Sequence, residues 1–309
     1  MTIPKNTRIV LNTLLFVFAC TLSFAQQTAA FSEYNYNPFI INSAYAGMLP
    51  TSEVTTSYSG IARTVEGSPT NFALSFNSPM SDGNMGFGAG FVRDQIGVTT
   101  NSNFFAAYSY KIRFDVRRKH YDWQIFEPGV LSFGINAGVK QFQENLLDLG
   151  ITDDATFAQN INANIPTVGM GVLYNHENFY AGLSIPNLLG DKLASRDDLQ
   201  LSQFYYGYFG YRIFMDVFNQ IMIKPNLLLK YENGAPLQAD LNLSVSFMNQ
   251  FELGGGYRTT SSVNAFAGIY LINHFRLLYQ YNMAIANSPI RNVHGLVLSY
   301  RFGSGYRGS

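Results

Sequence analysis

Apolar side chains recur at every second position from about residue 54 to residue 302, in stretches of roughly 8–14 residues bounded by Gly, Pro, Asn or Asp. In residues 237–247, Leu, Ala, Val and Phe alternate with Gln, Asp, Asn and Ser. A period of two predicts β-strands. A soluble sandwich would not accept the polar face in its core, whereas a membrane barrel turns its apolar face to lipid. The chain is therefore predicted to be all-β, a transmembrane antiparallel β-barrel.

The composition supports a membrane location. Charged residues make up 13% of the 309 residues, compared with about 25% in average soluble domains. The 20 Tyr and 26 Phe residues fit the aromatic belts that form where lipid meets water. The formal net charge of zero argues against nucleic acid as a partner, because phosphate binding requires a concentrated basic surface.

The N-terminus has the features of a secretory signal peptide. Lys5 and Arg8 supply positive charge, and residues 10–24 are mostly apolar. This stretch is shorter than the ~20 residues of a membrane-spanning helix, and cleavage is expected after about Ala25. We therefore expect residues 1–25 to be removed on export.

Cys20 is the single cysteine of the chain. It invites a lipoprotein interpretation, but Phe18 is bulky where that motif has a small residue, so Cys20 is better explained as part of the apolar stretch. The mature chain then has no disulfide and no thiolate metal site. No later segment holds ~18 consecutive apolar residues, so helical spans are not expected. An exported protein with lipid-facing strands is expected to be integral to a bacterial outer membrane.

About fourteen strands are expected, an even number that places both ends of the barrel in the periplasm. With boundary errors of about 2–4 residues, the predicted ranges are 53–63, 70–78, 84–96, 101–115, 126–142, 164–175, 178–185, 203–214, 222–231, 236–247, 250–258, 263–271, 274–283 and 293–302. Connections after even-numbered strands should be short and periplasmic, and most are. The two longest, about 143–163 and 186–202, follow odd-numbered strands, as external loops should. The connection between the fourth and fifth strands is a long exception.

The segment before the barrel does not alternate and is rich in Asn, Tyr and Pro. Its core, residues 31–50, contains turn signals and has three possible roles: a periplasmic docking segment, a plug inside the lumen, or an adaptor leading into the first strand. Candidate plug or partner-binding residues are Tyr34, Asn37, Pro38, Asn42, Tyr45 and Gly47. The mature chain thus divides into a periplasmic or plug segment at 26–50, a barrel at 51–303 and a periplasmic tail at 304–309.

Residues 31–47, Phe-Ser-Glu-Tyr-Asn-Tyr-Asn-Pro-Phe-Ile-Ile-Asn-Ser-Ala-Tyr-Ala-Gly, resemble the N-terminal signature of the PorP/SprF family of the type IX secretion system. That signature reads Phe-Ser-Gln-Tyr, then Asn-Pro, then Asn-Pro-Ala-Tyr-Ala-Gly, so the chain departs from it at Glu33 and Ser43. The resemblance covers almost the whole mature chain. Further segments similar to the family are 179–189, 224–226, 235–240, 256–258 and 294–302.

The resemblance implies a role in protein export and surface attachment in Bacteroidota-type bacteria. The resemblance also implies that the chain is a partner of large secreted adhesins with a type B C-terminal sorting domain, including gliding-motility adhesins. The implied partners are a secreted cargo or adhesin, other secretion-system components and outer-membrane lipids. A rival hypothesis is an outer-membrane diffusion channel or small-solute transporter, since this fold serves unrelated functions.

No residue pattern predicts an enzyme or a cofactor. The four histidines fall in or beside turns without metal-ligand spacing, and no Gly-x-Ser-x-Gly motif occurs. The glycines of residues 86–90 alternate on a strand, so they are better explained by close packing inside the wall than by a nucleotide loop. Carboxylates in the long loops could bind calcium, but they lack EF-hand spacing and are better explained as solvated charges. No catalytic residue or metal site is expected.

Two sets of charges are candidate sites. One set falls on the polar side of its strands, and we expect these charges to pair in a filled lumen rather than line an open channel. They are Lys140, Asp240, Glu252, Arg258, Arg276 and Arg301. The two carboxylates and the arginines at 258 and 276 are expected to form one network from wall to wall. The second set, Arg117, Arg118 and Lys119, faces the expected periplasmic side and is either solvated or a docking site for an acidic partner.

Overall fold

The computed structural model describes residues 33–61, 67–114, 129–151, 154, 158–189, 203–215, 221–259, 262–285 and 292–306. Strands form almost all of its regular structure. The elements are η1 (Glu33–Asn35), η2 (Pro38–Ile40), η3 (Ser43–Tyr45), β1 (Glu53–Ile61), β2 (Thr70–Pro79), β3 (Met85–Ile96), β4 (Thr99–Arg113), β5 (Val130–Glu144), η4 (Leu146–Leu149), β6 (Ile161–Asn175), β7 (Phe179–Ile185), β8 (Phe204–Tyr211), β9 (Ile213–Phe214), β10 (Ile221–Glu232), β11 (Gln238–Phe247), β12 (Phe251–Arg258), β13 (Ser262–Leu271), β14 (Phe275–Ala284) and β15 (Val293–Arg301).

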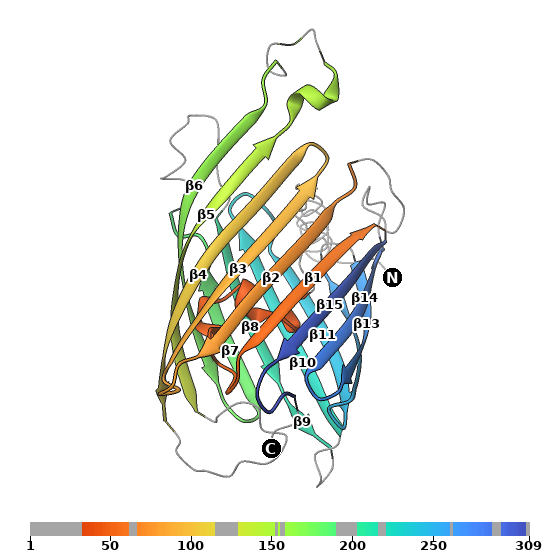
Figure 1. The fold of residues 1–309 in the computed structure, drawn as a ribbon. Helices are drawn as coiled ribbons and strands as arrows, with labels where there is room; N and C mark the ends of the chain where they lie inside the picture. The colour runs from red at the N-terminus through yellow and green to blue at the C-terminus, as the bar shows by residue number, and fades with distance from the viewer. Residues whose placement is uncertain are drawn as a thin grey trace, which may run out of the picture.

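The strands form one antiparallel sheet that closes into a barrel where the first strand, β1, pairs with the last, β15 (Figure 1). Fifteen strand segments take part. Two of them, β8 and β9, are parts of one strand, because both pair with β10 and only Arg212 separates them. The barrel therefore has fourteen strands, and the fold predicted from the sequence is confirmed. Among the described residues, no helix is long and apolar enough to cross a membrane.

The two faces of the wall have the polarity that the alternation predicts. On β11, Leu241 is 53% exposed on the outer face, whereas its neighbour Asp240 is 2% exposed on the inner face. Exposed and buried residues alternate in the same way on β4, β6 and β13, and the inner faces of these strands carry polar side chains together with apolar ones such as Leu173 and Phe266. Lipid takes the place of solvent on the exposed face, so large apolar side chains can remain there.

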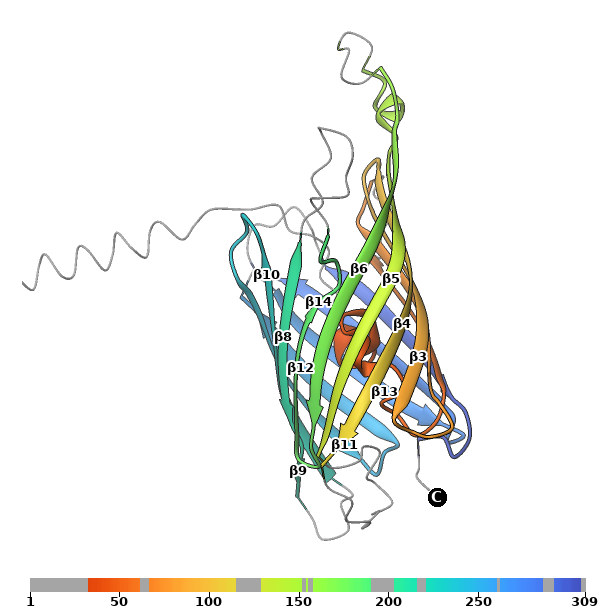
Figure 2. The ribbon, with the colours of Figure 1, turned by 90° about the vertical axis from the view of Figure 1, so that its left-hand side faces the viewer.

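The two ends of the barrel differ in their connections. Met248 and Asn249 between β11 and β12, and Ile272 and Asn273 between β13 and β14, all have positive φ, as tight hairpin turns require. These turns and the C-terminal end of β15 lie at the same end of the barrel, which we call the short-turn end (Figure 1). At the opposite, long-loop end, the β5–β6 hairpin rises above the other strands (Figures 1 and 2).

At its tip, the β5–β6 hairpin extends two residues beyond the predicted end of the fifth strand and begins the sixth three residues early, within the expected boundary error. Its strands pair without interruption from Val130↔Asn175 to Glu144↔Ile161. Beyond Val139 the outward residues become polar, so neither face of the hairpin is uniformly apolar. The alternation of apolar and polar residues that marks a membrane strand therefore ends there. Strand structure continues there because main-chain pairing does not require an apolar face.

The C-terminal residues after β15 fold back over the short-turn end. The Tyr306 N–H donates to the Asn273 carbonyl at 2.7 Å, and the Asn273 side chain donates to the Ser304 carbonyl at 2.7 Å. The Tyr306 ring is buried against Arg301, with 4.0 Å between the guanidinium carbon and the ring centroid. The tail thus covers the inner side of the last strand.

Candidate functional site

Residues 33–50, here called the plug segment, lie inside the barrel about midway between its ends (Figure 2). The segment consists of three short 3-10 turns, η1, η2 and η3. Pro38 occupies the first turn of η2, where its fixed φ fits and its missing N–H is not needed. The Asn42 side chain accepts a hydrogen bond from the Ala44 N–H at 2.9 Å and so begins η3. Local sequence therefore sets the turns, and the wall sets their position.

Side chains of the wall donate hydrogen bonds to main-chain carbonyls of the plug segment. Ser184 donates to Ile41 at 2.6 Å, Ser132 to Ala44 at 2.7 Å and Ser109 to Ala46 at 2.6 Å. Lys111 also donates to the Gly47 carbonyl, and Arg276 to the Tyr36 carbonyl at 2.7 Å. A carbonyl without a partner inside a barrel would lose its hydration without compensation. The polar inner face of the barrel thus satisfies the backbone of the plug segment.

Asn42 connects the plug segment to strands β6 and β8 of the wall. Its side chain is fully buried, and its amide nitrogen lies 3.0 Å from the Tyr208 hydroxyl and 3.2 Å from the Val172 carbonyl. Because the same side chain begins η3, one residue both shapes the segment and fixes it to β6 and β8.

Replacing Asn42 by Ala is expected to loosen the plug segment while the barrel stays folded. The change leaves buried partners without hydrogen bonds, at a cost of about 1–3 kcal/mol, which corresponds to about 5- to 150-fold faster local opening. Hydrogen exchange followed by mass spectrometry measures this at residues 43–48. Exchange in β11–β14 should stay unchanged, and equal exchange of the plug segment in both proteins would contradict the anchoring role.

Glycines of the wall lie where the plug segment approaches most closely. A Cβ at Gly88 would stand 2.6 Å from the Phe39 ring, closer than real Cβ atoms approach another atom. A Cβ at Gly86, Gly134 or Gly171 would collide with Ala46, Ala44 or Asn42 of the plug segment, respectively. The glycines of residues 86–90 thus include two that make room for a packed segment.

Apolar packing adds to these polar contacts, in three clusters. Tyr34, Ile41, Ala44 and Met48 of the plug segment pack with wall residues that include Leu173 and Tyr208. Phe39 and Ala46 pack with Ala73, Val92, Phe105 and Ala107, and Tyr36 packs with Phe266, Leu278 and Val297. Sequence reasoning missed these wall residues. Their signal was present, because large apolar residues on the inward side of a strand indicate a lumen that is not purely aqueous.

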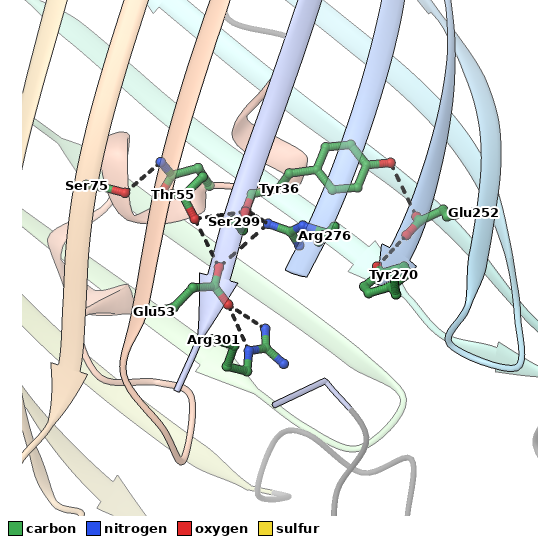
Figure 3. Close-up of polar contacts among 10 residues, drawn as sticks. Tyr36, Glu53, Thr55, Ser75, Glu252, Tyr270, Arg276, Ser299 and Arg301 are labelled. Carbon is green, nitrogen blue, oxygen red and sulfur yellow. Dashed lines mark hydrogen bonds and ion pairs between the residues drawn. The ribbon is translucent and has the colours of Figure 1, made fainter. Parts of the chain in front are cut away.

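The ionic groups at the short-turn end centre on Glu53 and Glu252 (Figure 3). Glu53 is 2.6 Å from Arg301 and 3.6 Å from Arg276. Glu252 is 2.6 Å from Lys224, and it accepts hydrogen bonds from Tyr270 at 2.9 Å and from Tyr36 at 3.3 Å. Tyr36 joins the two groups, because its carbonyl accepts from Arg276 and its hydroxyl donates to Glu252. The plug segment is thus part of the charge arrangement.

The single charge network expected from the sequence does not form. Asp240 pairs with Arg258 at 2.7 Å near the long-loop end, whereas Glu252 and Arg276 belong to the groups at the short-turn end. The reason is the position of each residue along its strand. Asp240 and Arg258 lie far from the 248–250 turn, whereas Glu252 lies beside it, so the two carboxylates are at different ends of the barrel. Lys140 lies on β5 towards the long-loop end. Glu53 and Lys224, which the sequence reasoning did not single out, are partners in the ion pairs at the short-turn end.

Of the predicted plug residues, all six lie in the lumen segment. Asn37 donates to Ser75 at 2.8 Å, and the Tyr34 hydroxyl accepts from Asn242 at 2.7 Å. Tyr45 lines a cavity of about 180 Å³ between the plug segment and the wall, with Tyr180, Tyr208 and Arg212. A Cβ at Gly47, where φ is +57°, would stand 2.6 Å from the Ser78 carbonyl. The segment and the wall therefore fit one another closely on several sides.

Several predictions lie outside the described residues. They are the signal peptide with Cys20, most of the 186–202 connection, and the basic cluster Arg117, Arg118 and Lys119. Within the part of the chain that the structure describes, no three His, Cys, Asp or Glu side chains gather where they could hold a metal ion.

Comparisons with known proteins give one family. The family model described as type IX secretion system membrane protein PorP/SprF matches residues 23–300. A search of curated proteins found no match.

Solved structures with a similar outline are outer-membrane proteins of low identity. Omp33 of Acinetobacter baumannii is 7% identical, with a TM-score of 0.46 over 83% of this chain and 100% of its own. A TodX deletion mutant, a monoaromatic hydrocarbon channel, is 8% identical, with a TM-score of 0.49 over 85% and 93%. Outer membrane phospholipase A of Escherichia coli is 11% identical, with a TM-score of 0.36 over 89% and 99%.

Proposed function

Because the chain belongs to the PorP/SprF family of type IX secretion system membrane proteins, we propose that it is a non-enzymatic, plugged barrel serving a dedicated cargo. The family resemblance seen in the sequence is confirmed, and with it an outer-membrane location. The barrel supports secretion and surface anchoring of an adhesin-like protein with a type B C-terminal sorting domain. The long-loop end faces outward and takes part in holding the cargo, since long loops are external in such barrels.

The observation that carries this proposal is the way the plug segment is held. Wall donors from β4, β5, β7 and β14 reach its carbonyls, and glycines of the wall leave room for its backbone. A segment held in this way blocks the open passage that a diffusion channel needs. A scaffold gains from it, because a filled barrel presents rigid ends to its partners.

Two measurements test the proposal. The purified wild-type protein in planar bilayers should show no stable conductance steps, because the plug segment fills the lumen. Deletion of the gene should leave most type IX cargo secreted but remove one dedicated adhesin from the cell surface, as measured by surface biotinylation and mass spectrometry. Ohmic steps from the wild-type protein would favour the channel, and an unchanged surface proteome would rule out the cargo role.

A further inference from the structure

The tip of the β5–β6 hairpin carries an exposed apolar surface. Leu147, Leu149 and Ile151 are 56%, 47% and 44% exposed. Leu147 and Leu149 lie on η4, and Gly150, with a φ of +67°, ends this turn and leads into Ile151. Leu146 is buried beneath the turn, so the other three apolar side chains remain outside. We call Leu147, Leu149 and Ile151 the hairpin tip.

A polar stretch separates the hairpin tip from the lipid-facing band. On β5 the outward residues are apolar up to Val139 and then become Gln141 and Gln143. On β6 the matching outward positions are Asn162 and Asn164. The hairpin therefore continues for about 15–20 Å beyond the apolar band, at ~3.3 Å per residue. Apolar side chains at this distance are not explained by contact with the membrane.

The charges around the hairpin tip have one sign. Asp148 is exposed beside the leucines, and Glu144 precedes them at the end of β5. Asp153 and Asp154 follow in the sequence, and no Lys or Arg occurs between Lys140 and Lys192. A surface that combines apolar and acidic residues is complementary to an apolar pocket edged by basic residues.

We propose that the hairpin tip is a docking surface for a protein partner outside the cell that presents an apolar pocket bordered by Lys or Arg. The inference rests on the proposed function, which supplies such a partner as cargo. Apolar side chains that lose contact with water at the centre of an interface stabilise the complex through the area they bury, and the surrounding acidic groups speed and orient the encounter. The partner's basic residues would lie around Asp148, with its pocket over Leu147 and Leu149.

The first test replaces the three residues together, as L147S/L149S/I151S. Surface proteins lost in the deletion strain are identified by biotinylation and mass spectrometry, then quantified in the variant. We expect at least about a tenfold loss of the same protein from the cell surface. The electrophoretic mobility of the barrel with and without heating should match that of the wild type, which shows that the variant is folded. The control is I96S/L188S, which changes two exposed apolar residues near the long-loop rim and should leave display unchanged.

The outcomes separate the two proposals. If the deletion strain loses its adhesin and the triple variant displays it normally, the docking surface is wrong and the cargo role stands. If the deletion strain loses nothing, both proposals fail. An Asp148→Lys variant should reduce display in low salt more than in high salt, because exposed charges are screened.

A second test asks whether the hairpin tip lies in lipid instead. Trp123 is the single tryptophan, so W123F/L149W carries one reporter at the hairpin tip. Its fluorescence in vesicles of brominated phosphatidylcholine should not be quenched. The matched control W123F/I135W, on the exposed outer face of β5, should be quenched strongly. Quenching of the reporter at position 149 would overturn the docking proposal.

Discussion

Replacement of Glu53 by Gln is expected to destabilise the barrel by about 3–5 kcal/mol, because removing one partner of a buried ion pair leaves uncompensated charge. Glu53 is the first residue of β1 and lies opposite Arg301, the last residue of β15. Its carboxylate accepts from Arg301 at 2.6 and 2.9 Å and from Thr55 at 3.1 Å, and lies 3.6 Å from Arg276 (Figure 3). The substitution thus removes the carboxylate partner of two buried arginines, Arg301 on the last strand and Arg276 on β14.

Urea unfolding of the protein folded in lipid vesicles measures this loss. Glu144→Gln is a suitable control, because Glu144 lies at the far end of β5 and accepts a single described hydrogen bond, from Thr99. Its expected effect is about 1 kcal/mol or less. The double variant E53Q/R301Q should be more stable than E53Q, since the pair is removed together. A Glu53→Gln protein as stable as the wild type would show that the seam does not depend on this carboxylate.

Strand parity and turn length were readable from the sequence because both are local. Each residue of an outer-membrane strand faces either lipid or lumen, so a period of two gives the side on which Leu241 or Asp240 lies. The 248–250 and 272–273 connections are tight hairpin turns with positive φ. Because short turns lie on the periplasmic side of such barrels, the length of these connections indicates the end that they occupy. These two features fixed the strand number and direction before any contact was known.

The pairing of charges could not be predicted in the same way. It depends on the position of each residue along the barrel axis as well as on the face of the wall that the residue occupies. Asp240 and Glu252 both face the lumen, but the 248–250 turn places them at different distances from the short-turn end. Counting residues from each turn would have separated them. Glu53 lies within the predicted strand 53–63, on the polar side that it shares with Thr55 and Ser57, so strand parity alone would have placed it in the lumen.

The position of the plug segment was the hardest feature to predict. Its turns follow from Asn42 and Pro38, but its seat depends on donors that are far away in the sequence, such as Ser132 and Ser184. A serine on an inward position has the same pattern in an open channel and in a filled one. Inward apolar residues such as Leu173 and Phe266 were the more specific signal, because an aqueous lumen has no use for them.

The second large effect concerns the close fit between the plug segment and the wall. The double variant G134A/G171A should displace the plug segment and turn a silent barrel into a conducting one. The added methyl groups would occupy the space of the Ala44 backbone and the Asn42 side chain. Alanine is more compatible with a strand than glycine, so the wall itself should not be weakened. The segment must therefore move, and it loses the hydrogen bonds from Ser132 and Ser184 when it does.

Planar-bilayer recording of the double variant measures the result as stable ohmic steps that the wild-type protein lacks. Gly268→Ala is the matched control, because Gly268 also faces the lumen but its Cβ would meet the flexible Leu278 side chain at 3.3 Å, and none of its three nearest atoms belongs to the plug segment. Protease cleavage within residues 33–50 should appear together with the conductance, because both report the same displacement. A folded double variant that shows no conductance and resists the protease would contradict this prediction. It would mean that the wall moves to accommodate the added methyl groups, and that Gly134 and Gly171 do not determine the position of the plug segment.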